Sequence, residues 1–177
     1  MDSFIFIQKR SLKNEEFQVD KLKHFFDEKL NILVKSTNRD LLISKTKKQI
    51  FNNISAPQIT DTLILTATSL IEKDPIFDEI ATQLLLQKTY RKVFQRKVNS
   101  NNFKELYQQF FISGLKTMIK RRKKSANPYL LEFDLEKLSQ SLVLERDALF
   151  NYIGLEVVYS RYLWRKDEQI LETPQAF

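Results

Sequence analysis

The sequence predicts a mainly α-helical fold, with an N-terminal β-hairpin and four helices, then a further helical segment and a C-terminal β-hairpin. Three observations support it. The 177 residues include only two Gly and four Pro, which disfavours turn-rich β folds and favours helices. Apolar residues recur at helical spacing through most of the chain. Short segments typical of strands stand near both ends.

The first elements are two strands and two helices. Residues 4–10 and 15–19 are expected to form strands joined by a connection at 11–14. Asp20 can then cap a helix with one apolar stripe. A second helix is expected over about 38–52.

Two later helices have clear start signals. Ser55-Ala56-Pro57 predicts a helix start, with Pro57 in the first turn, where its missing N–H does no harm. Asp74-Pro75 restarts the pattern, and this helix is expected to end near Phe94. The hairpin and four helices are predicted to form a first domain, residues 1–97.

A second domain is predicted over 98–177, after a polar stretch at 99–102. A helix is expected from Phe103 to Ile119, and residues 134–158 look helical. Gly154 is expected to interrupt or end one of these segments.

The C-terminal end combines a hairpin with an excess of apolar side chains. Strands 161–164 and 170–173 are expected to pair around a turn at 166–169. Because a hairpin alone cannot bury many side chains, we expect this end to pack against a partner. The side chains concerned are Tyr159, Tyr162, Leu163, Trp164, Ile170, Leu171 and Phe177.

Composition excludes several classes of protein. No cysteine is present, which excludes disulfides, Cys-based zinc sites, iron–sulfur clusters and thiol catalysis. No apolar run has the ~18 residues of a membrane span, and the N-terminus does not resemble a signal peptide. A cytoplasmic protein without a membrane partner is expected. The formal charge of +7 suits phosphates, whether of a nucleotide or a nucleic acid, or an acidic partner protein.

The strongest local signal is Lys9-Arg10 at the end of a strand. A hairpin would bring these cations close to Glu15, Gln18 and Lys21. Clustered Lys and Arg can hold a triphosphate, and Glu or Gln can contact a sugar or base. From the residues alone, a solvated hairpin with ordinary surface charges is the alternative.

Other polar groups favour structural roles. The basic run 120–124 has no aromatic residues between its charges to stack bases, so we interpret it as a solvated helix end. An acidic partner or nucleic acid is its alternative. His24 has no second ligand nearby in the sequence and is expected to be structural or exposed.

Carboxylate pairs can also be imagined, Glu145 with Asp147 or Asp167 with Glu172, but no His, Cys or metal cluster accompanies them. No catalytic residue and no metal site is predicted. The spacing of four aromatic residues indicates core or interface. They are Phe103, Tyr107, Phe110 and Phe111.

The order of several motifs resembles a known family. IQKR…EEFQVDKL, then IxDTLxxTAxxLI and IATQLLLQKTYRKVF, resemble an ATP-cone, the allosteric nucleotide-binding module at the N-terminus of many ribonucleotide reductases. Later motifs resemble the segment that leads into the catalytic barrel of the class I large subunit. They are LERD, LFxYxGL, RYL and ETPQ, within residues 144–175.

This resemblance implies a site for ATP or dATP, with Mg²⁺, and no tightly bound cofactor. The positions that match the family's nucleotide contacts are Lys9, Arg10, Glu15, Gln18, Lys21 and Arg91.

The sequence departs from the cone pattern at two places. Ser11-Leu12 replace the usual Asp-Gly, which would reshape the lid over the nucleotide. Ala56 and Thr60 stand where relatives often have Thr and His, and the lost hydroxyl would cost about 0.5–1.5 kcal/mol of binding free energy.

The resemblance implies an allosteric and structural part of a reductase that makes deoxyribonucleotides. Its partners would be the catalytic barrel portion and the small radical-generating subunit. Since the family's radical chemistry needs cysteines, the chain alone should be inactive, and a split enzyme or a truncated product would explain this. The alternatives are a structural segment with a degenerate cone, and a stand-alone nucleotide-responsive DNA-binding regulator, although we do not expect nucleic acid as a partner.

Overall fold

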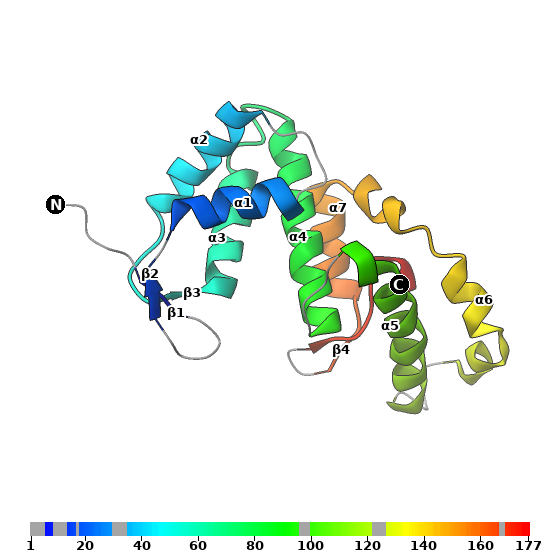
Figure 1. The fold of residues 1–177 in the computed structure, drawn as a ribbon. Coiled ribbons are helices and arrows are strands. Elements are labelled where there is room, and N and C mark those ends of the chain that lie inside the picture. The colour runs from blue at the N-terminus through cyan, green and yellow to red at the C-terminus, as the bar shows by residue number, and fades with distance from the viewer. Residues whose placement is uncertain are drawn as a thin grey trace. The chain divides into compact units, whose positions relative to one another are not determined.

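The computed structural model describes residues 6–8, 14–16, 18–29, 35–95, 100–121, 127–166 and 169–177. The chain forms two compact units, Met1–Leu85 and Leu86–Phe177. The division falls inside helix α4 (Ile76–Phe94), so the two parts of this helix belong to different units (Figure 1). The domain boundary predicted between residues 97 and 98 stays a prediction. Among the described residues, no helix is long and apolar enough to cross a membrane.

The first unit contains a small sheet with strand order β2-β1-β3. β1 (Phe6–Gln8) pairs antiparallel with β2 (Asn14–Glu16) and parallel with β3 (Ile54–Ser55). Of the first predicted strand, 4–10, the described residues 6–8 form β1. The second predicted strand, 15–19, does not reach Val19, which begins α1, and Asn14, expected in the connection, is paired in β2. Residues 9–13 lie outside the described residues. β3 was not predicted, because two residues of strand leave no periodic signal.

Three complete helices belong to this unit: α1 (Val19–Lys29), α2 (Ser36–Lys47) and α3 (Ala56–Thr68). The expected cap at Asp20 is wrong, because α1 already includes Val19 and Asp20 lies in its first turn. α2 also ends before residue 52. The chain turns there, and Asn53 has φ 64°, a left-handed conformation that Asn tolerates.

The starts of α3 and α4 are as predicted. Ser55 and Gln58 form a capping box: the Gln58 N–H donates to Ser55 Oγ, and the Ser55 N–H donates to Gln58 Oε1. Each bond satisfies a backbone donor near the start of the helix. At α4, Asp74 Oδ1 accepts from the Ile76 N–H, and Asp74 Oδ2 accepts from Asn38 of α2. These bonds hold the pKa of Asp74 below its ordinary value, with the Ile76 bond as the largest cause.

The first unit buries an almost entirely aliphatic core, drawn from α2, β3, α3 and the start of α4. α2 packs on α1 and α3. The most deeply buried side chains of the first unit are Leu42, Ile54, Leu63, Ala67, Leu70, Phe77, Ile80, Ala81, Leu84 and Leu85.

The second unit is built on the end of α4 and on α5 (Ser100–Arg121). The predicted helical stretch 134–158 is broken into separate pieces, some of which have side-chain caps. They include α6 (Leu135–Gln140), the 3-10 helix η2 (Leu144–Leu149) and α7 (Tyr152–Val157), with another 3-10 helix, η1 (Pro128–Glu132), before them.

Two of these caps are side chains that the helical pattern did not reveal. Asp134 accepts from the Lys137 N–H at the start of α6, and Asn151 accepts from the Gly154 N–H at the start of α7. The expectation that Gly154 interrupts or ends a helix is therefore wrong. It lies in the first turn of α7, where a Cβ would stand 2.9 Å from Asn151 Oδ1.

The C-terminal strands pair, but in a different place from the prediction. A π-helical turn, η3 (Val158–Tyr162), continues α7 and takes up residues expected in the first strand. The strands are β4 (Arg165–Lys166) and β5 (Gln169–Ile170), antiparallel, and a short 3-10 helix, η4 (Pro174–Ala176), follows. One further backbone bond, from Leu171 N–H to the Trp164 carbonyl, extends the contact.

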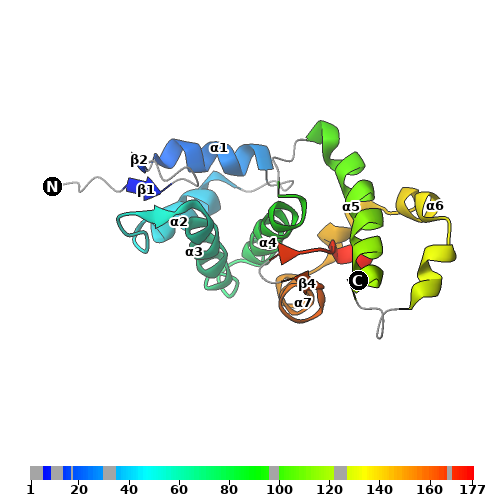
Figure 2. The same ribbon diagram turned by 90° about the horizontal axis from the view of Figure 1, so that it is seen from below.

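The C-terminal segment lies against α5 (Figure 2). At Gly114 of α5, a Cβ would come within 2.4 Å of the Leu171 carbonyl oxygen. No side chain fits there without movement of the backbone. Gly114 is therefore required by this close approach.

Candidate functional site

The predicted nucleotide contacts are described only in part. Lys9 and Arg10 lie outside the described residues, and Glu15 is described only as a backbone position in β2. Gln18 and Lys21 are exposed at the start of α1, where the Lys21 N–H donates to the Gln18 carbonyl. These two side chains lie together at a helix N-terminus, a place that favours anions.

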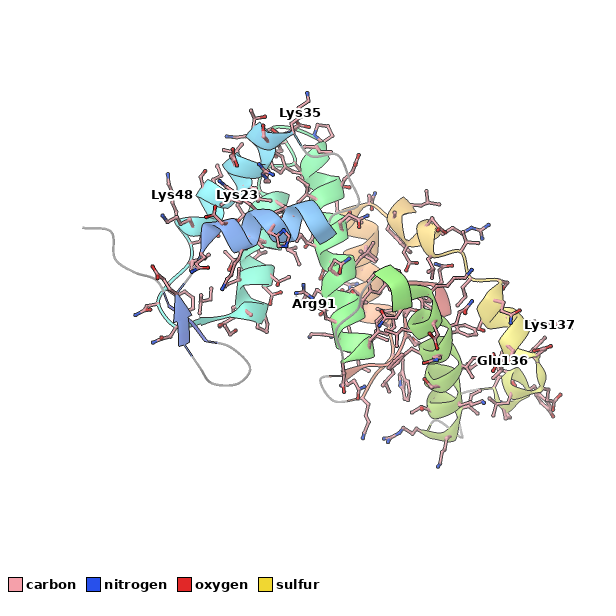
Figure 3. All side chains as sticks on the ribbon, viewed as in Figure 1. Lys23, Lys35, Lys48, Arg91, Glu136 and Lys137 are labelled. Atoms are coloured by element: carbon pink, nitrogen blue, oxygen red, sulfur yellow. The ribbon has the colours of Figure 1, made fainter. Side chains whose placement is uncertain are left out.

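Arg91 belongs to the second unit, on the exposed surface of α4 (Figure 3). His24 is exposed on α1, which agrees with the expectation for it.

The hydroxyl groups at the start of α3 make local bonds. Ser55 Oγ donates to Gln58 Oε1, and Thr60 Oγ1 donates to the Ala56 carbonyl at 3.3 Å. With Ala at position 56, this helix start offers a ligand fewer donors than a Thr there would. The base that such a site would select stays a prediction.

A buried carboxylate accepts three hydrogen bonds from other side chains. Asp147 is 1% exposed. Its Oδ2 accepts from the Tyr90 hydroxyl at 2.6 Å and from the Tyr107 hydroxyl at 2.7 Å. Its Oδ1 accepts from Gln175 Nε2 at 2.9 Å. We call these four residues the Asp147 cluster.

The cluster ties together four segments of the second unit. Tyr90 comes from α4, Tyr107 from α5, Asp147 from η2 and Gln175 from the C-terminal end. Both ends of the Gln175 side-chain amide also bind the backbone of Val143. Its Nε2 donates to the Val143 carbonyl, and its Oε1 accepts from the Val143 N–H. The Gln175 amide is thereby fixed with its donor toward the carboxylate.

Burial is the main cause of the pKa shifts in the Asp147 cluster. It raises the pKa of Asp147 above 3.8, and the three donated hydrogen bonds only partly oppose the rise. Burial, together with the Asp147 charge, raises the pKa of Tyr90 and of Tyr107 far above the usual tyrosine value. Both tyrosines therefore remain hydrogen-bond donors at physiological pH.

These contacts decide between the interpretations of the carboxylates. Asp147 is buried with three donors, whereas Glu145 is exposed, so the two do not form an acid–base pair. Glu172 accepts from the Trp164 N–H at 2.7 Å, and Asp167 lies outside the described residues. Asp147 and Glu172 both make hydrogen bonds within the second unit, and the lack of a catalytic role for them stays a prediction.

Aromatic side chains surround the cluster, as expected for core residues. Tyr90 packs on Phe103 with ring centroids 4.9 Å apart, and Phe94 packs on Phe110 at 5.1 Å. Tyr107 is fully buried and contacts Tyr90, Phe94 and Phe103 edge-on.

A second polar feature, which sequence reasoning missed, surrounds the buried ring of Tyr159. Arg165 Cζ lies 4.9 Å from the ring centroid, Lys88 Nζ 5.3 Å and Lys92 Nζ 6.0 Å. Each contact is worth about 0.5–1 kcal/mol at an exposed site. The Arg165 guanidinium also donates to the Tyr159 carbonyl. We call these four residues the Tyr159 cation cluster.

The charge distribution contained a signal for this cluster. Residues 88–97 hold five Lys and Arg and no Asp or Glu. The second unit as a whole has 17 Lys and Arg against 10 Asp and Glu, a formal charge of +7, whereas the first unit has 12 of each. The entire formal charge of the chain therefore belongs to the second unit.

The C-terminal apolar side chains are mostly covered by the second unit itself. Tyr159, Leu163, Trp164 and Ile170 are buried, because α5 and α7 supply the surface that a hairpin lacks. The expectation that this whole group needs a partner is therefore too broad. Tyr162 and Phe177 remain exposed, with ring centroids 5.0 Å apart.

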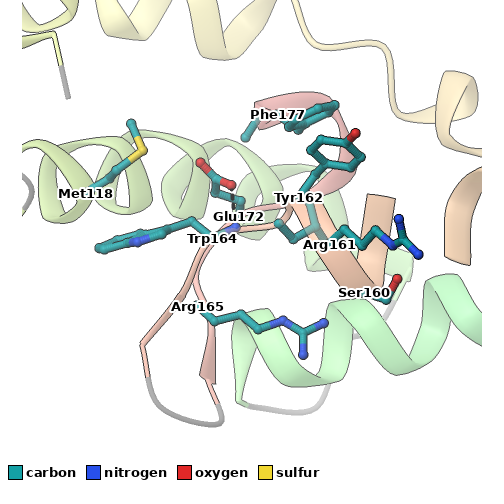
Figure 4. A pocket seen from close by; sticks show the side chains of 10 residues that line it. Met118, Ser160, Arg161, Tyr162, Trp164, Arg165, Glu172 and Phe177 are labelled. Atoms are coloured by element: carbon teal, nitrogen blue, oxygen red, sulfur yellow. Dashed lines mark hydrogen bonds between the residues drawn. The ribbon is translucent and has the colours of Figure 1, made fainter. Parts of the chain in front are cut away.

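These two rings border an open groove of about 510 Å³ (Figure 4). Trp164 and Met118 also line it, together with Arg161, Arg165 and Glu172. Among the described residues, no group of three or more His, Cys, Asp or Glu is placed to hold a metal ion.

Comparison with known proteins gives several relatives. The chain is 29% identical over 143 residues to the ribonucleoside-diphosphate reductase subunit alpha of Chlamydia pneumoniae, covering 81% of this chain and 13% of that protein. It is 28% identical over 173 residues to the subunit of the same name from Helicobacter pylori strain 26695, covering 97% of this chain and 21% of that protein. No family model matches the chain.

The chain is therefore homologous to the N-terminal part of ribonucleoside-diphosphate reductase alpha subunits. It spans between about an eighth and a fifth of the length of these relatives. The resemblance inferred from the motifs is confirmed at this level.

Proposed function

We propose that this homologue of the N-terminal reductase region is a regulatory and structural part of a ribonucleotide reductase, which binds ATP or dATP and thereby controls assembly and activity. The observation that carries the proposal is the homology to alpha subunits over 80% or more of the chain. The Lys9-Arg10 segment, which resembles a cone, supports the nucleotide-binding role.

A regulatory role requires a difference in affinity between two states of the complex. An effector shifts an equilibrium only by as much as it binds one state better than the other. ATP and dATP would therefore favour different assemblies of this region with the catalytic barrel portion and the radical-generating subunit. The chain has no cysteine, so the thiol chemistry of the reaction would come from the barrel portion.

Calorimetric titration with ATP and dATP, each with Mg²⁺, tests nucleotide binding. We expect saturable binding that Lys9→Ala or Arg10→Ala weakens at least about tenfold, because each loses a charge-assisted contact to phosphate. Lys48→Ala is the matched control, since Lys48 is an exposed lysine of the first unit (Figure 3). Equal affinity in all four proteins would contradict the proposed site.

A second candidate, a purely structural segment with a degenerate cone, is favoured by the local hydrogen bonds at Ser55 and Thr60. The two candidates differ in one result. If the chain binds neither nucleotide but is still required for activity when it is combined with the barrel portion and the radical-generating subunit, the structural role is correct. A salt-dependent shift of a DNA duplex would instead indicate the DNA-binding regulator.

A further inference from the structure

We propose that the Tyr159 cation cluster, in the second unit, binds a compact polyphosphate anion, either inorganic triphosphate or the triphosphate group of a nucleotide. Its residues are different from the proposed contacts at Lys9 and Arg10. It consists of residues 88 and 92 on α4 and residue 165 on β4, gathered around the Tyr159 ring.

Three cations lie around one aromatic ring. All three charged groups lie within 6.0 Å of the same ring centroid. Lys88 and Lys92 stand four residues apart on α4, where like charges repel one another, and the repulsion falls when an anion neutralises them. The ring offsets part of the repulsion through its negative face, so the cluster can persist without ligand and strengthens when an anion binds.

Arg165 is positioned in advance for such a ligand. Its guanidinium donates to the Tyr159 carbonyl and lies over the ring of the same residue. A guanidinium has five N–H donors, so others remain for phosphate oxygens. Because two contacts already fix the group, less side-chain freedom is lost when the anion binds.

Acidic residues also neighbour this cluster, in the structure or along the sequence. Glu156 and Lys88 both act on the pKa of Tyr152, in opposite directions, so Glu156 partly balances Lys88. The charges of Lys92 and Arg165 come in addition. Along the sequence, Asp167 and Glu168 follow Arg165 closely, and both lie outside the described residues.

The geometry favours a small multivalent anion over nucleic acid. A single strand is held by aromatic rings whose faces stack on bases, but the Tyr159 ring is 7% exposed and has cations over it. Three charges around one point match several phosphates linked together, whereas a nucleic-acid backbone spreads its charge along a groove.

Calorimetric titration of the full chain with inorganic tripolyphosphate tests the inference. We expect one site whose dissociation constant rises at least about tenfold in Lys92→Gln with Arg165→Gln, because two charge-assisted contacts are lost. Arg165→Lys keeps the charge and should lie between that double variant and the wild type. Binding should weaken as salt increases.

Two controls separate this site from others. Lys137→Gln removes an exposed charge of the same unit, one that pairs with Asp134 at 3.6 Å, and should leave the affinity within about twofold, since exposed pairs contribute little. Lys9→Ala with Arg10→Ala should also leave tripolyphosphate binding at this cluster in place, whether or not ATP binding is lost.

Three results would overturn the inference. The first is unchanged affinity in the Lys92 and Arg165 double variant, with circular dichroism showing it folded. The second is a loss of binding in Lys9→Ala with Arg10→Ala alone. The third is a DNA duplex that binds this cluster and is not displaced by tripolyphosphate. Repeating the titration with ATP then distinguishes a nucleotide ligand from free triphosphate.

Discussion

The buried threonines of the first unit and the buried Asp147 of the second unit satisfy their polar groups in different ways. In the first unit, the buried polar side chains described are threonines whose hydroxyls donate to the carbonyl four residues earlier in the same helix: Thr46, Thr60, Thr66 and Thr82. In the second unit, Asp147 takes its donors from 57, 40 and 28 residues away. Local bonds form with the helix itself, whereas the bonds of Asp147 form only when four segments meet.

This difference makes the second unit more sensitive to single substitutions in its polar core. The only tryptophan, Trp164, is buried in the second unit, so its fluorescence reports on that unit. Circular dichroism reports on the helices of both units. Urea unfolding followed by the two signals can therefore test each unit separately.

The largest effect is expected from Asp147→Ala. The change leaves the Tyr90 hydroxyl, the Tyr107 hydroxyl and the Gln175 amide without their acceptor, and we expect a loss of about 3–5 kcal/mol in the free energy of unfolding. The midpoint of the Trp164 fluorescence transition in urea measures it. Glu145→Ala removes an exposed carboxylate of the same 3-10 helix and should change the midpoint little. A similar small shift for both variants would show that the cluster contributes little.

Gly114→Ala tests the close approach of the C-terminal segment to α5. Since the added Cβ would stand 2.4 Å from the Leu171 carbonyl oxygen, the segment must move, and we expect a loss of about 1–3 kcal/mol. This outweighs the gain of up to about 1 kcal/mol from replacing glycine in a helix. Ser113→Ala, at an exposed neighbouring position, is the control. If Gly114→Ala is stabilising instead, the contact is not as close as described.

The pH dependence of stability should identify Asp147 as a buried acid. Burial raises its pKa above 3.8 in the folded state, so the unfolded chain gives up this proton at lower pH. The contribution of Asp147 to the free energy of unfolding is therefore present at low pH and is lost as pH rises through the pKa of the folded state. The loss is about 1.4 kcal/mol per unit of difference between the folded and unfolded pKa.

The measurement compares wild type with Asp147→Asn, because other titrating groups cancel in the difference. The stability advantage of the wild type should shrink as pH rises from about 4 to 7. An advantage that grows over this range would mean that the folded pKa of Asp147 is lowered instead.

The smallest effect is expected in the first unit, from Ser55→Ala. Loss of the capping box should cost about 1 kcal/mol, and it should be visible in the circular dichroism transition. If the two units unfold independently, the Trp164 transition should not move. Ser44→Ala, on the exposed face of α2, is the control. A shift of the Trp164 transition by the same amount would show that the units unfold together.

Part of the fold was predictable from short-range signals. The starts of α3 and α4 follow from Ser55-Ala56-Pro57 and Asp74-Pro75, because a cap acts within about three residues of its helix. The break between α6 and α7 was missed, because the sequence between them still has Leu and Val at the spacing typical of a helix. Asn151 and Asp134 cap helices there, but their positions did not stand out from ordinary polar residues.

The candidate site was predicted to a smaller extent. Motif order along the chain indicated the reductase relatives, and the comparisons confirmed this. The gathering of Lys88, Lys92 and Arg165 around Tyr159 could not be derived, because it joins residues of α4 to residues at least 67 positions further along the chain. Only the absence of acids from residues 88–97 pointed toward a basic surface.

The sequence by itself determined the helical character, the two clear helix starts, the lack of thiol chemistry and the homology to the reductase N-terminal region. These depend on composition, on order and on contacts between near neighbours. Tertiary structure alone decided that Asp147 is a buried anchor and that Gly114 permits a backbone contact. It also placed the start of the first C-terminal strand at Arg165, four residues later than predicted. Such features depend on which distant groups meet, and burial then sets the energy of each contact.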